Sequence, residues 1–459
     1  MSSGPLPPSP GQFLVVGFGG ICLDYLAVVT TFPKPDDKTR SSSMKIQGGG
    51  DAANTVTCLA RLGVRTRLIS KLADDVHGKS LLEELTADGV DTSFLVVAKD
   101  GQTPFSYIIV DQSTRTRTCI FTPGFPLMEP VDVSPDIESA LEGANFVYFD
   151  ARYADTAIVV AQEAAKQNIP ILLDAEKKRP GLDDLLDLSD YVVCSAKFPQ
   201  AWTEASSLPS ALISMLLRLP KLKFAIVTLG EHGCLMLERS SEEKPLMGEE
   251  DANRLWRSLK QDKDDSKAEP TCIPSEVVKL KANGIGTLTG RLFVFTAERI
   301  PPSELVDTTG AGDAFIGAVL YALCMNMIPE NMLPFAATVA AAGCKELGAR
   351  TGLPHATHPR LARFLGQTDN SAKSNGECLS HIGPILSHVD MEPASTASVS
   401  VSELGARTGL PYRTHPRLAP VLGQTDDSAK PNGECLSHNG QIMSHVDMVL
   451  VPAAASVSV

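Results

Sequence analysis

Residues 306–323 read Val-Asp-Thr-Thr-Gly-Ala-Gly-Asp-Ala-Phe-Ile-Gly-Ala-Val-Leu-Tyr-Ala-Leu, and this stretch decides the fold more than any other. The turn Gly310-Ala311-Gly312 precedes Asp313 and a run of small and apolar residues that predicts a helix. Glycines at a helix start let backbone N–H groups converge on an anion, and the helix dipole favours negative charge there. A carboxylate beside such a site suits a base that deprotonates a hydroxyl as it attacks phosphate. A strand-to-helix turn with Asp313 as N-cap is the alternative.

A second glycine-rich turn lies at residues 48–54, which read Gly-Gly-Gly-Asp-Ala-Ala-Asn and precede a predicted helix at 55–62. Consecutive glycines permit a ligand to approach the backbone closely. Asn54 in this stretch carries an amide that can both donate to and accept from hydroxyl groups. An ordinary turn with Asp51 as a helix cap is the alternative.

Asp24 follows the first predicted strand, Phe13–Phe18. A carboxylate that accepts from two neighbouring hydroxyls is a common way to bind a sugar, and an ordinary loop acid is the alternative. The strand ends in Gly17-Phe-Gly-Gly20, but this spacing is not G-x-G-x-x-G and no suitable helix follows. We therefore set aside a dinucleotide-binding oxidoreductase.

These stretches resemble the two signatures of the pfkB (ribokinase-like) carbohydrate kinases, and the resemblance extends over roughly residues 12–365. It implies a kinase that uses ATP and Mg²⁺, with Asp313 as the catalytic base. The expected acceptor is a hydroxyl, primary in our interpretation, of a sugar or a nucleoside. The resemblance assigns Gly310, Ala311 and Gly312 to the anion hole, and Asp24, Gly49, Gly50, Asp51 and Asn54 to the acceptor.

Two positions depart from the pattern of that family. Many relatives carry Asn where this chain has Asp51, so the acceptor contact keeps its oxygen but loses the amide donors. Relatives often hold Mg²⁺ and phosphate near an N-x-x-E motif, which reads Lys197-Phe-Pro-Gln200 here. Lys197 is predicted to pair with phosphate as a point charge. The departures leave open a second hypothesis, a kinase-fold protein that binds a ligand or acts as a scaffold without turnover.

The resemblance also assigns residues near the nucleotide. Residues 228–233, Thr-Leu-Gly-Glu-His-Gly, end a predicted strand and look like the family's TLG-x-x-G turn, although a plain hairpin turn competes with this interpretation. It assigns Thr228, Gly230 and Gly233 to the nucleotide site.

A monovalent cation, K⁺, is also implied beside the anion hole, with Asp307, Thr309 and carbonyls around 342–348 as its ligands. Residues 149–152 and 174–180 look more like ketohexokinases and plant pfkB proteins than bacterial ribokinases. Within the first of these stretches, Asp150 and Arg152 are candidates to line the sugar pocket.

Composition limits the classes of function. The chain has 459 residues, 43% of them hydrophobic and only 5% aromatic, which predicts a large aliphatic core. A net charge of −13 and the lack of a Lys/Arg run argue against a nucleic-acid partner. Ten scattered cysteines without CxxC spacing are typical of free thiols in a reducing compartment. We expect no membrane span, a cytoplasmic location, and a monomer or homodimer.

Apolar runs and helical patterns alternate along the chain. The runs at 67–70, 146–149, 169–173, 191–194 and 224–229 predict strands, and the stretches 78–85, 156–166 and 208–217 predict helices. This alternation predicts a three-layer α/β/α domain, residues 12–366, with a central and mostly parallel sheet. Two extended polar segments, at about 36–48 and 103–122, suit a small β-sheet lid.

Two further regions stand apart. The polar stretch at about 240–283 is predicted to be a surface insertion, mostly loop. Residues 346–391 recur at 403–448, an offset of 57 residues. We expect 367–459 to be disordered, because two copies cannot form a solenoid and the unit is poor in apolar residues. The histidines of the repeat suggest a metal-binding tail, but their spacing fits no common site.

Deletion of the chain beyond about residue 367 is expected to leave activity and thermal stability unchanged. The reason is that a segment with few apolar residues buries little surface on the domain. Melting temperature and turnover of the shortened chain would check this. A large loss of either would mean that the repeat packs on the domain.

Overall fold

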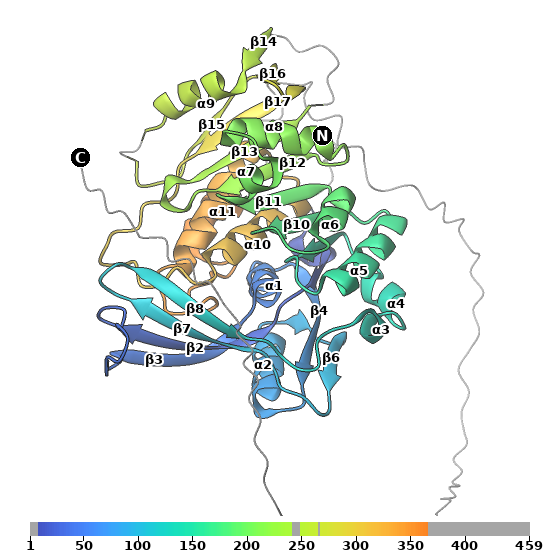
Figure 1. Cartoon of the computed structure of the whole chain (residues 1–459), viewed down its shortest axis with the longest axis vertical. Coiled ribbons are helices and arrows are strands. Elements are labelled where there is room, and N and C mark those ends of the chain that lie inside the picture. Colours follow the sequence, from blue (N-terminus) through green and yellow to red (C-terminus); the bar gives the residue numbers. More distant parts are fainter. Residues whose placement is uncertain (1–7, 241–247, 265–266, 366–459) are drawn as a thin grey trace, which may run out of the picture. The chain divides into compact units, whose positions relative to one another are not determined.

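The computed structural model describes residues 8–240, 248–264 and 267–365. Within these residues, a 13-stranded sheet lies between two layers of helices, and a separate four-stranded sheet projects from one side (Figure 1). The sheet order is β14-β16-β17-β13-β12-β11-β10-β9-β1-β4-β5, with β15 paired to β17 and β6 to β4. The predicted three-layer α/β/α domain with a small β-sheet is confirmed.

The middle of the large sheet is parallel, and its strands are short apolar runs because helices cover both of their faces. In β10, for example, Leu173 pairs with Val192 of β11, and Leu172 pairs with Tyr148 of β9. The parallel strands are β1 (Leu14–Phe18), β4 (Arg65–Ala73), β5 (Val90–Asp91), β6 (Leu95–Ala98), β9 (Phe146–Phe149), β10 (Ile171–Ala175), β11 (Tyr191–Ser195) and β12 (Phe224–Thr228).

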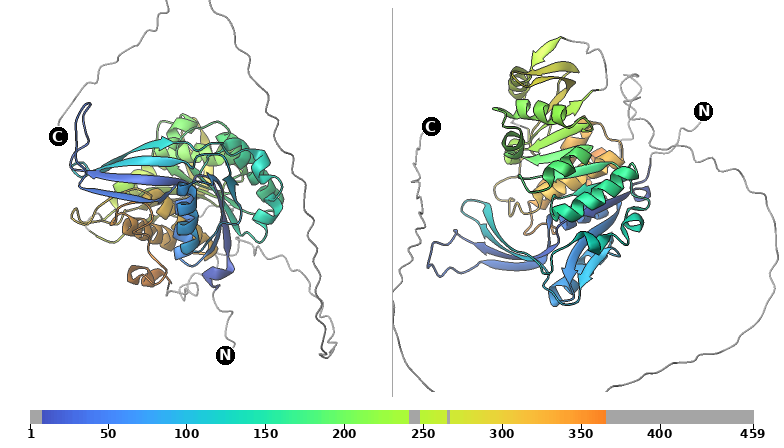
Figure 2. Two further views of the ribbon diagram at one scale, coloured as in Figure 1. Left: turned by 90° about the horizontal axis from the view of Figure 1, so that it is seen from below. Right: turned by 45° about the vertical axis from the view of Figure 1, so that its right-hand side comes forward.

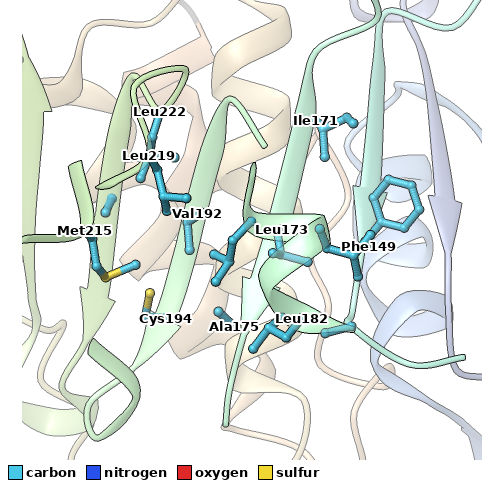
Figure 3. Packing of buried hydrophobic residues seen from close by; sticks show 14 of the residues in the cluster. Phe149, Ile171, Leu173, Ala175, Leu182, Val192, Cys194, Met215, Leu219 and Leu222 are labelled. Carbon is cyan, nitrogen blue, oxygen red and sulfur yellow. The ribbon is translucent and has the colours of Figure 1, made fainter. Parts of the chain in front are cut away.

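Two hydrophobic clusters fill the spaces between the sheet and its helices. Alternate residues of a strand enter opposite clusters, as Leu173 and Leu172 do. One face is covered by α5 (Ala154–Lys166), α6 (Leu182–Leu188), α8 (Leu208–Arg218) and α9 (Ala252–Gln261). The other is covered by α1 (Asp51–Arg61), α2 (Val76–Ala87), α10 (Ala311–Cys324) and α11 (Pro329–Gly343). Figure 3 shows the first cluster, in which aliphatic side chains from β10 and β11 meet those of α6 and α8.

One edge of the sheet is formed by chain that was predicted to be a polar loop, and that prediction was wrong. Among the described residues of 240–283 are α9, β14 (Glu249–Asp251), β15 (Cys272–Pro274) and β16 (Val278–Ala282). In β16, Val278 and Leu280 are buried while Lys279 and Lys281 are exposed, so alternation with lysine hid a half-buried strand. β13 (Cys234–Arg239) and β17 (Gly286–Phe295) join this edge to the parallel strands by antiparallel pairing.

The separate sheet has the order β3-β2-β7-β8 and extends away from the body of the domain (Figure 2). Its strands are β2 (Cys22–Val29), β3 (Ser43–Gly49), β7 (Phe105–Asp111) and β8 (Thr116–Thr122). The two predicted lid segments supply β3, β7 and β8, although residues 36–42 form no strand. β2 was not predicted, so Asp24, expected to follow the first strand, lies inside a second strand that belongs to this sheet.

Short helices complete the described chain: η1 (Pro10–Gln12), α3 (Pro130–Val133), α4 (Ile137–Leu141), α7 (Phe198–Thr203), η2 (Gly230–His232), η3 (Pro359–Leu361) and α12 (Ala362–Leu365). No helix in the described ranges has the length and apolar character needed to cross a membrane. The expected disorder of 367–459, including the second copy of the repeat, lies outside the described residues.

Candidate active site

The glycine turn sits at the N-terminus of α10, and Gly310 is the N-cap of that helix. Its φ is 73°, and a Cβ there would lie 2.5 Å from the Cβ of Ala349, so another side chain would be strained and crowded. Within the described chain, the amides of Gly312 and Asp313 have no hydrogen-bond acceptor, and the space where a Gly312 side chain would stand is open. These amides at the helix N-terminus fit an anion such as a phosphate.

Asp313 is the third residue of α10, not its N-cap, and its carboxylate is buried. The Asn54 side chain, from α1, donates from Nδ2 to Asp313 Oδ2 at 2.8 Å. Asn54 Oδ1 in turn accepts from Arg350 Nε at 2.9 Å, which fixes the amide orientation because a guanidinium can only donate. The turn at 48–54 and the turn at 310–313 therefore meet at one carboxylate.

The protonation of Asp313 depends on this setting. Burial, with the neighbouring charge of Asp51, raises the pKa of Asp313 to about 8, against the opposing effect of the Asn54 hydrogen bond. The carboxyl can thus exchange a proton near neutral pH, which suits a general base. It lies beside the free amides of the same helix turn, where an anionic group would bind.

A second group of charges surrounds Asp51, the first residue of α1. Arg152 Nη2 donates to Asp51 Oδ2 at 2.6 Å, and the two side chains form an ion pair. Asp150, at the end of β9, accepts from the backbone amides of Gly20 and Ala52 at 2.6 and 3.2 Å. Burial and Asp51 raise the pKa of Asp150 to about 6. Asp150 thus holds the α1 N-terminus in place, and Asp51 is bound to a cation instead of capping the helix.

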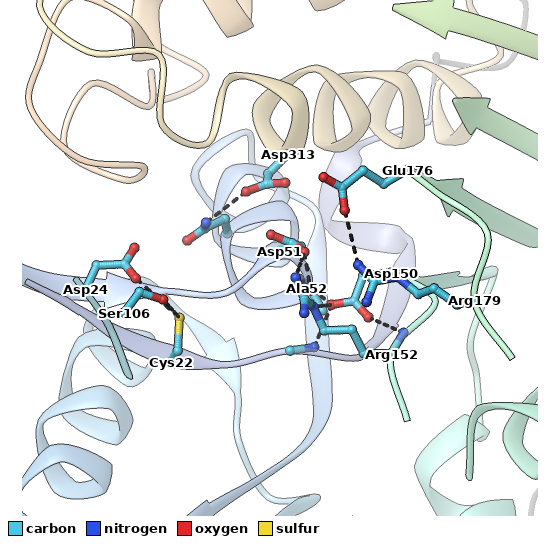
Figure 4. Close-up of polar contacts among 12 residues, drawn as sticks. Cys22, Asp24, Asp51, Ala52, Ser106, Asp150, Arg152, Glu176, Arg179 and Asp313 are labelled. Carbon is cyan, nitrogen blue, oxygen red and sulfur yellow. Dashed lines mark hydrogen bonds and ion pairs between the residues drawn. The ribbon is translucent and has the colours of Figure 1, made fainter. Parts of the chain in front are cut away.

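Asp24 comes from β2 of the small sheet and interacts electrostatically with Asp51, and Figure 4 shows it in one view with Asp51 and Asp313. The Cys22 thiol donates to Asp24 Oδ1 at 3.3 Å, and burial raises the pKa of Asp24 to about 6. A Cβ at Gly49, on the paired strand β3, would lie 2.0 Å from Asp24 Oδ2. Gly49 is therefore required for the small sheet to bring this carboxylate to the site.

The small sheet also contacts the α10 turn and the segment behind it. Arg117, on β8, donates from Nη1 to Thr308 Oγ1 at 3.0 Å. Lys45, on β3, donates to the Leu347 carbonyl at 3.0 Å and to Thr351 Oγ1. The sheet is thus held against the site by polar groups on both of its outer strands.

The residues assigned to a nucleotide lie at the end of β12. Thr228 donates from Oγ1 to the Cys194 carbonyl at 3.2 Å, which ties this turn to β11. Gly230 has a φ of 60° with open space beside it, whereas a Cβ at Gly233 would lie 1.9 Å from the Phe295 carbonyl oxygen. The stretch is therefore a tight β-hairpin connection to β13, with Gly230 as its accessible glycine.

The substituted N-x-x-E positions occupy the start of α7. Lys197 is its N-cap residue and is exposed, and it has no partner among the described residues. Gln200 donates from Nε2 to the Ala205 carbonyl at 3.5 Å, so its amide is engaged at the far end of the helix. Lys197 stays available to an anion, while Gln200 does not replace a metal-binding carboxylate.

Asp307 and Thr309, the residues assigned to K⁺, are hydrogen-bonded to each other. Asp307 Oδ1 accepts from the Thr309 amide and hydroxyl at 3.0 and 2.8 Å, and Oδ2 accepts from the Gly348 amide at 3.0 Å. These bonds fix the loop before the Gly310–Gly312 turn, and the K⁺ site stays a prediction. Among the described residues, no group of three His, Cys, Asp or Glu side chains could hold a metal ion.

Sequence reasoning missed Arg350, the cation that joins the site to the structure around it. It is fully buried, donates to Asn54 and to the Gly49 carbonyl at 2.9 Å, and lies 3.8 Å from Glu84. The one feature of the sequence that could have pointed to Arg350 is its position among the glycines of residues 346–354, the segment that closes the domain. Arg117 was also missed, because it lies in an exposed polar strand and no feature of the sequence distinguishes it from its neighbours.

A family model described as pfkB family carbohydrate kinase matches residues 12–248 and 246–356. The chain belongs to the pfkB family of carbohydrate kinases. It is accordingly a phosphotransferase with an alcohol group as acceptor, as predicted from the two glycine-rich signatures.

Members of the family resemble this pfkB protein over most of its length. Mouse ketohexokinase is 25% identical over 351 residues, which are 74% of this chain and 96% of the relative. Mouse ribokinase is 23% identical over 357 residues, 76% and 94% of the two chains. Among solved structures, Arabidopsis thaliana ribokinase complexed with ribose and ATP has a TM-score of 0.53 at 20% identity, over 79% and 99%. Burkholderia thailandensis nucleoside kinase in complex with inosine has a TM-score of 0.54 at 17% identity, over 77% and 98%.

Proposed function

We propose that this protein transfers the γ-phosphoryl group of ATP to a hydroxyl, a primary CH₂OH, of a sugar or a nucleoside. The observation that carries the proposal is Asp313, a buried carboxyl with a pKa raised to about 8, next to the unpaired amides of its own helix turn. The proposed base and the proposed anion site are thus on one helix turn, and in-line transfer requires base and phosphate to be positioned together. Relatives named ribokinase, ketohexokinase and nucleoside kinase support the class of acceptor.

The proposed reaction follows from these groups. Asp313 takes the proton of the acceptor hydroxyl, the hydroxyl oxygen forms a bond to the γ-phosphorus, and the bond to the bridging oxygen breaks to release ADP. The amides of the Gly310-Ala311-Gly312 turn and of Asp313 stabilise the charge on the transferred group. Mg²⁺ bound with ATP would supply further neutralisation, and K⁺ near Asp307 and Thr309 remains part of the proposal.

The acceptor is held on the opposite side by the small sheet and by α1. Asp24 offers Oδ2 to sugar hydroxyls, and Asn54 has a second amide hydrogen beside the one given to Asp313. Thr228, Gly230 and Lys197 are proposed to contact the nucleotide. The free cysteines of the described chain, seven of eight at least partly buried, fit a reducing compartment, so we propose a cytoplasmic location.

The test is ADP release with Mg²⁺-ATP over a panel of ketoses, aldoses and nucleosides. Turnover on one acceptor establishes the kinase and names its acceptor class. ATP binding without turnover on any acceptor would favour the alternative, a non-catalytic binding or scaffold protein, which Gln200 motivates because its amide is engaged with Ala205. Absence of ATP binding would exclude the proposed kinase.

The variant Asp51→Asn is expected to shift the pH dependence of kcat/KM to lower pH. In the wild-type protein kcat/KM should rise with pH as Asp313 loses its proton, with a midpoint near its pKa of about 8. The Asp51 charge raises that pKa, so an uncharged side chain lowers it and also leaves the positive charge of Arg152 unbalanced. Initial rates from pH 5.5 to 9.5 measure the midpoint.

The matched control is Asp155→Asn, which removes an exposed acid from the first turn of α5. Its midpoint should coincide with that of the wild-type protein. A midpoint of Asp51→Asn that stays in place, or that moves to higher pH, would contradict the charge coupling between Asp51 and Asp313.

A further inference from the structure

A cleft of about 520 Å³ lies at the turn between β10 and α6, where α7 and the end of α8 complete its walls. Its polar lining consists of Lys178, Arg179, Asp183, Trp202 and Arg218. None of these side chains has a role in the proposed phosphoryl transfer. The volume is within the range of small-molecule sites, roughly 300–1,000 Å³.

The lining is cationic although the chain as a whole carries a net charge of −13. Lys178, Arg179 and Arg218 face one acid, Asp183, whose Oδ1 already accepts from Trp202 Nε1 at 2.7 Å. Lys178 has no partner among the described residues and is exposed. Positive charge is therefore concentrated at the mouth of this cleft.

One arginine is available at small cost. Arg179 is bound to Glu176 at 3.1 Å, as Figure 4 shows, and the Glu176 side chain is 59% exposed. An exposed pair of this kind contributes about 0–1 kcal/mol, so an anion in the cleft can replace Glu176 as the partner of Arg179. The guanidinium fork also matches the oxygens of a phosphate.

The other wall is rigid before any ligand arrives. Trp202 lies between the Phe198 ring, with centroids 6.5 Å apart, and the Arg218 guanidinium, 5.4 Å from its ring centroid. Arg218 is further fixed by donating to the Thr203 carbonyl at 3.2 Å. The stacked side chains hold Arg218 in place, which lowers the entropy cost of binding.

We propose that this cleft is an accessory site for a small phosphate-bearing molecule, with Lys178 and Arg179 as its phosphate ligands and Arg218 as a third positive charge. A single phosphate ester fits better than a nucleic acid, because the positive charge is confined to one concavity on an acidic chain. No lining residue of this cleft is among those proposed to contact ATP or the acceptor, and its occupation does not depend on turnover.

Trp202 provides a direct measurement, because the chain has only two tryptophans and the other is Trp256 on α9. In a Trp256→Phe background, Trp202 emission is titrated with glucose 6-phosphate and with inorganic phosphate at constant ionic strength, and with glucose as the neutral probe. Melting temperature is recorded in parallel on the chain with both tryptophans. We expect a saturable emission change and a raised melting temperature with glucose 6-phosphate, and neither with glucose. Inorganic phosphate shows whether the phosphoryl group alone suffices.

The double variant Lys178→Gln/Arg179→Gln should weaken glucose 6-phosphate binding at least tenfold. Lys177→Gln, a neighbouring lysine outside the cleft lining, is the matched control and should bind as the parent does. Equal affinity in the double variant would place the anion elsewhere, for example at the α10 turn, and overturn the proposal. No saturable response to either phosphate, or an equal response to glucose, would overturn it as well.

Discussion

Replacement of Asp313 by Asn is expected to reduce turnover by roughly 10²- to 10⁴-fold, the usual contribution of a general base. The amide cannot take the acceptor proton, yet its oxygen can still accept from Asn54 Nδ2, so the geometry around it should persist. ADP release on the acceptor found with the panel measures the effect. ATP binding should be retained, because the turn amides are unchanged. Turnover within tenfold of the wild-type protein would remove Asp313 from the role of base.

The same variant should be more stable than the wild-type protein at pH 8. The pKa of Asp313 is about 8 in the folded chain and about 3.9 in an unfolded one, so the unfolded chain loses this proton first. The free energy of unfolding contributed by Asp313 thus falls as pH rises from about 4 to 8. An asparagine at this position does not titrate, so its contribution to the free energy of unfolding does not fall with pH. Urea unfolding at pH 4.5 and 8 should therefore show a gain for Asp313→Asn at pH 8 that largely disappears at pH 4.5.

Arg350→Met is expected to cost about 3–5 kcal/mol in the free energy of unfolding and to reduce turnover strongly. Methionine fills the space but leaves the Asn54 Oδ1 and the Gly49 carbonyl without a donor, at about 1–3 kcal/mol for each buried group. Asn54 then loses the contact that orients it toward Asp313. Urea unfolding gives the stability, and kcat on the identified acceptor reports the effect on the base.

Arg363→Met is the matched control on the same C-terminal segment. Arg363 pairs with Glu269, whose side chain is 72% exposed, so its loss should change stability by no more than about 1 kcal/mol. Turnover should be unaffected. If Arg350→Met were as mild as this control, the hydrogen bonds from Arg350 would not be what positions Asn54.

The main sheet could be predicted from the sequence because each of its central strands is a separate apolar run. Runs such as 191–194 have no polar residue to disguise them, and helices with clear periodicity stand between them. Prediction failed where polar residues interrupt the apolar run of a strand. β16 alternates valine and leucine with lysine, and β2 carries Asp24 amid apolar residues directly after the glycines that end β1. A strand of that kind can be assigned only when the strands that pair with it are known.

The candidate site was predictable in part, for a related reason. The glycine-rich and acidic stretches 48–54 and 306–313 could be recognised in the sequence, because such stretches have few purely structural uses. Nothing local shows that Asn54 bonds to Asp313, or that Arg350 orients it across 296 residues of chain. These contacts depend on how α1, α10 and the closing segment pack together. The ion pair between Arg152 and Asp51 could not be predicted for the same reason.

Asp24 lies on the small sheet, whereas Asp313 belongs to a helix of the main body, and this separation bears on how new specificities arise. A mutation in β2 or β7 can reshape the proposed acceptor pocket without altering the Gly310–Gly312 turn, whereas β8 contacts that turn region through Arg117 and β3 contacts Arg350 through Gly49. Gene duplicates could therefore diverge toward different nutrients while inheriting one reaction unchanged. Directed evolution of this protein toward an unnatural alcohol would best begin its libraries on those two inner strands.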